Sequence, residues 1–440
     1  MRLAWPLAIA VSAMPALAQY AGPAILSRGD APSSMSAPEV DFRPFVNIAA
    51  SYASGLSSLQ PGSQGTTLGD VSSLGVLLSF GVSGTHSWKH TKVGVDYAGS
   101  ISHYNNAAYG GYDNQSFLLS VSHQFSPHTS FSLRNNASIV SQPFSLPVLP
   151  QTVTFDPSST YNPTTDFYNN RTISLGTYAS FTLQKSARLS FNFGGQSGLT
   201  ERQGGVGLYS TTSAGATGDA QYRLTAHTTV GGLYSYTHFE FHGTFNATDV
   251  QSLSGTYSIQ LSRGLEFSGF GGFSQIESKF LENVPLSPAL ASLIGFANGV
   301  VINYTHAYHP TFSGRFSRSF PRGVAFLSSA YSVTPGNGLF LTSTALTNSA
   351  GYSYTGLRRW SLGAGATYLR ASSISNVTGR YGDLSGNLLA SRQVGRFIHV
   401  TLNWSVMKYQ SGSFAGYNRL TYAGNLGLAF SPGDIPLRVW

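Results

Sequence analysis

Apolar and polar residues alternate with a period of two through almost the whole chain after residue 41. In residues 252–262, one set of alternate positions reads Leu, Gly, Tyr, Ile and Leu, and the other contains only Ser, Thr and Gln. Residues 172–184 and 398–406 repeat the pattern. A β-strand points successive side chains to opposite faces, whereas a helix would spread these alternate residues around its circumference. The sequence therefore predicts an all-β fold.

Short polar turns divide the alternating region at regular intervals. They fall near residues 90, 127, 186, 226, 263, 322, 358 and 396, at spacings of 36 to 40 residues except for two of 59. A hairpin of two tilted membrane-spanning strands, each of about 9–11 residues, occupies about this length together with one loop. Eight short turns with a free strand at each end predict about eighteen strands. Sixteen would also fit, because boundaries assigned this way vary by about 2–4 residues.

The composition favours a wall that faces lipid. Charged residues make up 10% of the chain, against about 25% in a typical soluble domain. A soluble β-sandwich or propeller would cover its outer face with charge, so it fits less well. The polar positions are mostly Ser, Thr, Gly, Asn and Gln, which suits a water-filled lumen. We therefore expect a transmembrane antiparallel β-barrel with short periplasmic turns and longer outer loops.

The N-terminus has the three parts of a secretory signal. Arg2 is followed by an apolar stretch to Leu17, and Ala16, Leu17 and Ala18 form a small-residue cleavage site. We predict a signal peptide at 1–18, a flexible periplasmic lead-in at 19–41 and an outer-membrane barrel domain at 42–440. The chain has no Cys, which excludes disulfides and thiolate metal sites. Export through a cleaved signal peptide would place the protein in the cell outer membrane.

Residues 42–440 resemble the bacterial outer-membrane β-barrel superfamily, and its porin-like members in particular. The resemblance rests on hairpin spacing, two-residue alternation and aromatic strand ends, and it implies a channel. Such barrels often finish on an aromatic residue, and this chain ends at Trp440. Pro432, Gly433 and Pro436 interrupt the last segment, so either Trp440 or Phe430 could close the final strand.

The two 59-residue intervals each contain a long outer loop. The loop near 143–168 lies in the third hairpin, is rich in Pro, and carries Asp156 and Asp166. In many porin-like barrels the third outer loop folds inward, so the resemblance makes these two aspartates candidate constriction residues; an exposed surface flap is the alternative. In the loop near 283–299, Ser287 and Pro288 can begin an apolar helix. That helix could plug the mouth, pack against the other long loop or join subunits, and we predict a plug or lid.

Charge is distributed unevenly along the predicted barrel axis. Basic residues cluster at the short turns, and acidic residues concentrate at the opposite ends of the strands. Basic side chains at the turns can reach phospholipid head groups, which is the interpretation we favour. A basic periplasmic mouth that attracts anionic solutes or an anionic polymer is the alternative. A ring at turns is not a nucleic-acid-binding patch, so we predict no nucleic-acid partner.

Few charges are expected on the lumen face, and they are mixed in sign. The candidates are Asp96, Arg134, Asp219, Glu266 and Arg315. A strongly selective pore would carry a ring of one sign, so these residues predict weak ion selectivity. Tyr and Asn also gather at the outer strand ends. Aromatic rings beside amides suit carbohydrate binding, but the aromatic girdle of outer-membrane barrels explains them more simply.

Two patterns are similar to metal or catalytic sites. His238, Glu240 and His242 alternate along one strand, as metal-chelating residues can, but no third His with suitable surroundings accompanies them. His242, Gly243 and Thr244 resemble the His-x-Ser pair of some outer-membrane lipases, with Thr in place of Ser and no orienting partner. We therefore predict no enzyme activity, no metal and no cofactor.

Three functions fit the sequence. The first is a porin-like channel for passive diffusion of small solutes. The second is an outer-membrane component of exopolysaccharide export or assembly, and the third is a plugged structural or adhesive barrel. The expected partners are outer-membrane lipids, together with small solutes or polysaccharide. A homo-oligomer or a periplasmic partner would also be compatible with the sequence.

Overall fold

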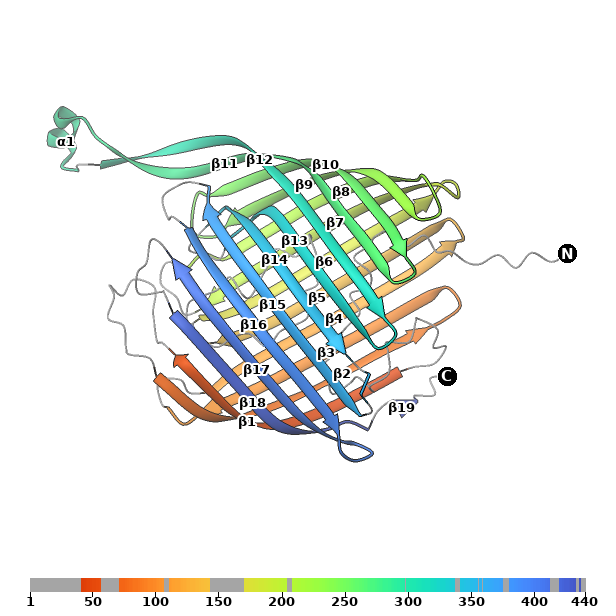
Figure 1. Ribbon diagram of the computed structural model, residues 1–440. Coiled ribbons are helices and arrows are strands. Elements are labelled where there is room, and N and C mark those ends of the chain that lie inside the picture. The colour runs from red at the N-terminus through yellow and green to blue at the C-terminus, as the bar shows by residue number, and fades with distance from the viewer. Residues whose placement is uncertain are drawn as a thin grey trace.

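The computed structural model is a closed antiparallel β-barrel of eighteen long strands (Figure 1). It describes residues 41–56, 71–106, 111–142, 170–203, 208–296, 298–336, 341–354, 356–357, 359–374, 380–411, 419–432 and 435–436. Each strand pairs with the next one along the chain, and β1 pairs with β18 to close the wall. The prediction of an eighteen-strand barrel is therefore confirmed. The predicted signal peptide and nearly all of the lead-in lie outside the described residues.

The first nine strands run from β1 to β9. They are β1 (Asp41–Leu56), β2 (Val71–Ser87), β3 (Thr91–Tyr104), β4 (Gly111–Ser126), β5 (Thr129–Gln142), β6 (Asn170–Gln184), β7 (Leu189–Gln203), β8 (Thr211–Arg223) and β9 (Thr228–Phe241). The second nine complete the wall. They are β10 (Ala247–Ser262), β11 (Leu265–Pro285), β12 (Asn298–Phe320), β13 (Gly323–Thr334), β14 (Ser343–Tyr354), β15 (Trp360–Ser373), β16 (Arg380–Gln393), β17 (Ile398–Ser411) and β18 (Arg419–Phe430). In the described part of the chain, the remaining elements are a helix α1 (Pro288–Ile294) and a two-residue strand β19 (Ile435–Pro436).

All eight predicted short turns join consecutive strands at one end of the barrel, from β2–β3 to β16–β17. The even strand number places the start of β1 and the end of β18 at this same end. Phe430 is the last residue of β18 and pairs with Val46 and Ile398. It therefore closes the final strand, whereas Trp440 lies outside the described residues.

The outer surface of the wall is apolar, as alternation predicts. On β17 and β18, Leu402, Leu426 and Leu428 are 47%, 58% and 61% exposed. A closed barrel that exposes large aliphatic side chains around its wall requires an apolar solvent. The chain is a transmembrane β-barrel of the outer-membrane type. No helix among the described residues is long and apolar enough to span a membrane.

The basic residues near the short turns contact aromatic rings of the wall. The guanidinium carbons of Arg318, Arg392 and Arg396 lie 4.9, 5.3 and 5.0 Å from the ring centroids of Phe320, Trp360 and Phe397, respectively. On β12 and β16, Arg318 and Arg392 alternate in phase with the exposed apolar residues Phe316 and Leu388. These cations therefore belong to the membrane interface, where basic side chains reach lipid head groups. The interpretation favoured from the sequence agrees with this placement.

The hairpin of β11 and β12 projects beyond the outer rim of the barrel (Figure 1). β10 pairs with β11 only as far as Lys279, and β13 pairs with β12 only from Phe312 inward. Helix α1 begins at Pro288, as predicted. It lies at the tip of this hairpin, away from the barrel, and Leu293 is 82% exposed. The prediction that this helix plugs the lumen is therefore wrong.

The projecting part of the hairpin should be dispensable for the barrel. Phe280 and Asn303 face each other in the β11–β12 ladder, so an Asn-Gly turn can replace residues 281–302. We expect the shortened chain to keep the heat-modifiable migration of a folded barrel in detergent gels. This change leaves the hydrogen-bonded pairing of neighbouring strands within the wall, from β1 to β18, intact. Loss of heat-modifiable migration would show that the hairpin is needed for folding.

Candidate functional site: the barrel lumen

Hydroxyl and amide groups line the face of the strands that is opposite the exposed apolar rows. Neighbouring strands share hydrogen bonds across this face. The pairs are Ser132–Ser180 (2.6 Å), Ser138–Ser174 (2.6 Å), Ser252–Ser274 (2.7 Å), Thr182–Asn192 (3.2 Å) and Thr401–Asn47 (3.2 Å). Because the groups in these pairs are neutral on both strands, they make the wall polar without adding charge. Such a surface is wettable and offers weak hydrogen bonds to many solutes.

The outer half of the lumen is narrowed by an apolar cluster against β9, β10 and β11. Phe239, Phe241, Val250 and Ile276 face the lumen there and are at most 7% exposed. Three residues pack against them from the outer ends of β13, β14 and β15. These are Val333, Leu341 and Ile374.

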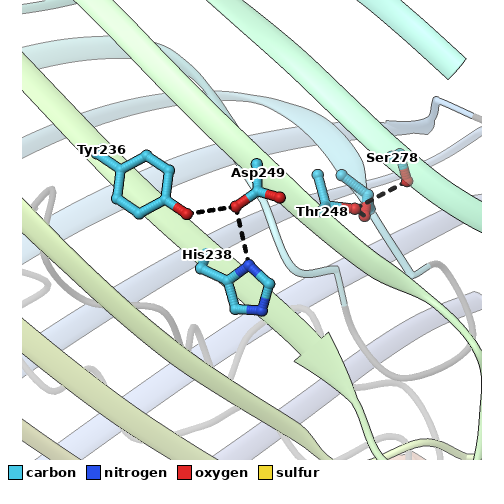
Figure 2. A network of polar contacts seen from close by, with 6 residues as sticks. Tyr236, His238, Thr248, Asp249 and Ser278 are labelled. Carbon is cyan, nitrogen blue, oxygen red and sulfur yellow. Dashed lines mark hydrogen bonds and ion pairs between the residues drawn. The ribbon is translucent and has the colours of Figure 1, made fainter.

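The segment before β14 therefore lies inside the barrel, against the wall formed by β9–β11. The Thr248 hydroxyl, on the lumen face of β10, is 2.6 Å from the Thr342 hydroxyl just before β14. Thr248 also contacts Ser278 of β11 at 2.8 Å, and Figure 2 shows these two residues together. The β12–β13 ladder ends at Phe312 and Tyr331, which frees the end of β13 to turn inward. This inward segment and the four buried side chains form the outer constriction.

A second cluster lies in the outer half of the lumen, on β1, β3 and β18. Tyr104, Ala53 and Ala423 are buried together, with Tyr112 packed against them. The Tyr104 hydroxyl is 3.0 Å from that of Ser51 on β1. The ring crosses β2 over Gly75, where an added Cβ would lie 2.8 Å from Tyr104 Cδ1 and 2.4 Å from the His103 carbonyl oxygen. Only glycine leaves room for this ring at that position.

The five charged residues predicted for the lumen lie in the periplasmic half of the barrel. Each occupies the strand face opposite the exposed apolar row, and they are Asp96, Arg134, Asp219, Glu266 and Arg315. Asp219 accepts a hydrogen bond of 2.9 Å from Gln221 Nε2. The Arg315 guanidinium lies 5.1 Å from the centroid of the Phe326 ring. Their effect on conduction stays a prediction. Asp156 and Asp166, the candidate constriction residues, lie outside the described residues.

Two buried charges in the outer half were not predicted. Arg202 of β7 is 8% exposed and donates from Nη1 to the Tyr209 carbonyl oxygen at 2.9 Å. Asp383 of β16 is 2% exposed, between Leu369 and Tyr409 on the neighbouring strands. Because both residues lie on the polar face of an alternating strand, the sequence pattern could have assigned them to the lumen. Their burial could not be read from alternation, because it depends on what fills the outer lumen.

Two of the residues considered for a metal site, His238 and Glu240, do not face the lumen. His238 and Glu240 alternate with the buried lumen residues Phe239 and Phe241, so they point outward. His238 Nδ1 is 2.9 Å from Asp249 Oδ1 on β10. In the part of the chain that the structure describes, no three His, Asp or Glu side chains are grouped to hold a metal ion.

No protein-family model and no curated protein sequence matches this chain. Solved structures with a similar fold include the FrpB iron transporter from Neisseria meningitidis, at 12% identity and a TM-score of 0.41, covering 86% of this chain and 67% of that one. OccK5 (OpdH) from Pseudomonas aeruginosa has 12% identity and a TM-score of 0.40, with 90% and 98% covered. A BenF-like porin from Pseudomonas fluorescens has 11% identity and a TM-score of 0.39, with 89% and 98% covered. At these identities and TM-scores the matches assign neither a family nor a substrate.

Proposed function

We propose that this barrel is a porin-like channel for passive diffusion of small polar solutes, with its constriction in the outer half of the lumen. The observation that carries the proposal is the polar lining of paired hydroxyl and amide groups inside an eighteen-stranded wall. Barrels of about 16–18 strands are wide enough to enclose an aqueous channel. Selection would act by size at the outer constriction and by lumen polarity. This mechanism needs no catalytic residue and no cofactor.

The mixed charges of the periplasmic half support weak ion selectivity. Asp96, Asp219 and Glu266 face the lumen together with Arg134 and Arg315, so neither sign dominates. A ring of one sign would be needed for strong discrimination. The reversal potential under a KCl gradient should therefore lie close to zero, and Arg315→Ala should shift it toward cation preference.

Planar-bilayer recording of the purified full chain tests this function. We expect steady current from single channels without any added partner. Heat-modifiable migration in a detergent gel checks that the same preparation is folded. A folded barrel that carries no current would contradict the proposal.

A second candidate is a plugged structural or adhesive barrel. The burial of the outer lumen clusters and the projecting hairpin favour it. A role in exopolysaccharide export is less well supported, because the cations Arg318, Arg392 and Arg396 contact aromatic rings near the short turns. A folded barrel without current that also tolerates outer-lumen substitutions without opening would favour the plugged barrel.

A further inference from the structure

Four strands carry a regular polar patch on the outer face of the wall. The ladder places His238, Asp249, Glu277 and His306 side by side in one row across β9, β10, β11 and β12. The next row toward the membrane reads Tyr236, Gln251, Gln275 and Tyr308. Both rows have aromatic or imidazole rings at their ends and carboxylates or amides in the middle. We call these eight residues the outer-rim patch.

The patch is held in shape by its own contacts. Tyr236 donates from its hydroxyl to Asp249 Oδ1 at 2.5 Å, and the same oxygen lies 2.9 Å from His238 Nδ1. Figure 2 shows both rings directed at Asp249, while Thr248 points to the other face of the wall. On the other side, Gln275 Nε2 donates to Glu277 Oε1 at 2.9 Å. The two rings at the β9 end and the carboxylates of Asp249 and Glu277 are therefore set in place before any ligand binds.

The depth of the patch puts it at the level of lipid head groups. Gln275 lies ten residues beyond Leu265, where β11 begins. At about 3.4 Å per residue and a tilt of about 40°, this rise is about 26 Å, and the apolar band of an outer-membrane barrel is about 25 Å tall. The next outward-facing row toward the periplasm supports this depth, since its apolar residues Leu253 and Phe273 are 68% and 70% exposed. The patch therefore begins where the hydrocarbon ends.

The charge of the outer-rim patch determines which lipid head groups it can bind. Asp249 and Glu277 are direct cross-strand neighbours, and Glu240 lies one row farther out. Lys279 is the cation in that outer row. Two adjacent carboxylates repel a phosphate, so an anionic head group is disfavoured. They are good acceptors for sugar hydroxyls, amides can both donate and accept, and aromatic rings can pack on the apolar face of a pyranose.

We propose that the outer-rim patch binds the uncharged sugar head group of a glycolipid in the outer leaflet. The acyl chains of that lipid would lie on the apolar row of Leu253 and Phe273, and its sugar would lie on Gln251, Gln275 and Tyr308. Tyr308 is 67% exposed, and its ring makes an edge contact with His306 at 5.0 Å between centroids. Because the patch is outside the barrel, its failure would leave the channel function untouched.

Native mass spectrometry of the detergent-solubilised full chain tests the proposal. The probe is digalactosyl diacylglycerol, compared with phosphatidylglycerol of the same acyl chains. We expect the glycolipid to be retained at least tenfold more tightly. The double variant Gln251→Ala with Gln275→Ala and the single variant Tyr308→Ala should each lose about tenfold of that binding, with phosphatidylglycerol unchanged.

Tyr422→Ala is the matched control. Tyr422 is an aromatic residue at the outer end of β18, stacked on Trp404 on the lipid-facing side of the wall, and its loss should leave glycolipid binding unchanged. Equal loss in Tyr308→Ala and Tyr422→Ala would reduce the patch to an ordinary aromatic girdle and overturn the proposal. Preference for phosphatidylglycerol would overturn it as well. Competition by an equal concentration of free digalactose would assign the patch to soluble glycans instead of a membrane lipid.

Discussion

Replacing both Val333 and Leu341 by Ser is expected to raise the single-channel conductance several-fold. These side chains pack the inward segment against Phe239, Phe241, Val250 and Ile276. Removing two half-buried apolar groups should weaken that contact by about 2 kcal/mol. This raises roughly thirtyfold the ratio of barrels whose inward segment is displaced, with a wider conducting lumen, to barrels in which it stays packed. The substitutions leave the pairing of β9, β10 and β11 intact. Planar-bilayer recording at fixed voltage measures the effect, as the size and duration of open events.

Val140→Ser provides the control for this variant. Val140 faces the lumen near the outer end of β5 and is not among the residues packed against the constriction cluster. It therefore receives the same chemical change without loosening the inward segment, and its conductance should stay near that of the unmodified chain. An unchanged conductance in a folded Val333→Ser, Leu341→Ser barrel would place the constriction elsewhere.

Local patterns in the chain predict the wall well because barrel geometry is repetitive. Strand alternation depends only on each strand and its solvent, so Leu253 and Leu402 could be assigned to the lipid face without any tertiary information. The turns could be placed because each is short and polar, and each ends a strand of similar length. Closure then follows, since every strand in the membrane needs two hydrogen-bonded neighbours.

The outer half of the lumen was harder to predict because it depends on contacts between distant segments. The start of α1 at Pro288 was predicted from local capping chemistry, but its location was not. That location follows from the loss of β12–β13 pairing beyond Phe312, which is set by the inward turn of the following hairpin. One local signal was present: Val250 stands among Ser and Thr on the polar face of β10, where an apolar residue needs a packing partner.

The outer-rim patch shows a second limit of prediction from the sequence. Asp249 and Glu277 are 28 positions apart in the sequence, and only the register of β10 with β11 makes them neighbours. A shift of one residue would move every side chain of a strand to the other face. The alternation of each strand predicts which residues point outward, but a transverse row requires four registers to be known together. Sequence reasoning identified His238 as part of a candidate site and missed its partner Asp249.

Placing an arginine on the lipid face should be strongly destabilising in a way that depends on depth. Leu426 is 58% exposed on the outside of β18, four residues from the periplasmic end at Phe430. This position is about 10 Å into an apolar band about 25 Å tall, close to its middle. We expect Leu426→Arg to lower the free energy of unfolding by about 2–4 kcal/mol, since the guanidinium must be taken into hydrocarbon. Urea titration of the barrel in lipid vesicles, followed by tryptophan fluorescence, measures this loss.

Leu420→Arg tests whether membrane depth is the cause. Leu420 lies on the same face of the same strand and is 48% exposed, but it is one residue from the outer end at Arg419. There the guanidinium can reach the interface, so the cost should be about 0–1 kcal/mol. Both positions pair with β17, but only Leu426 also pairs with β1. Leu426→Ala and Leu420→Ala therefore measure how much of the difference comes from side-chain loss and strand pairing rather than from the charge. Equal costs at Leu426 and Leu420 would mean that this wall does not cross a hydrocarbon layer at the assigned depth, whereas a large difference would fix the position of the membrane on the barrel.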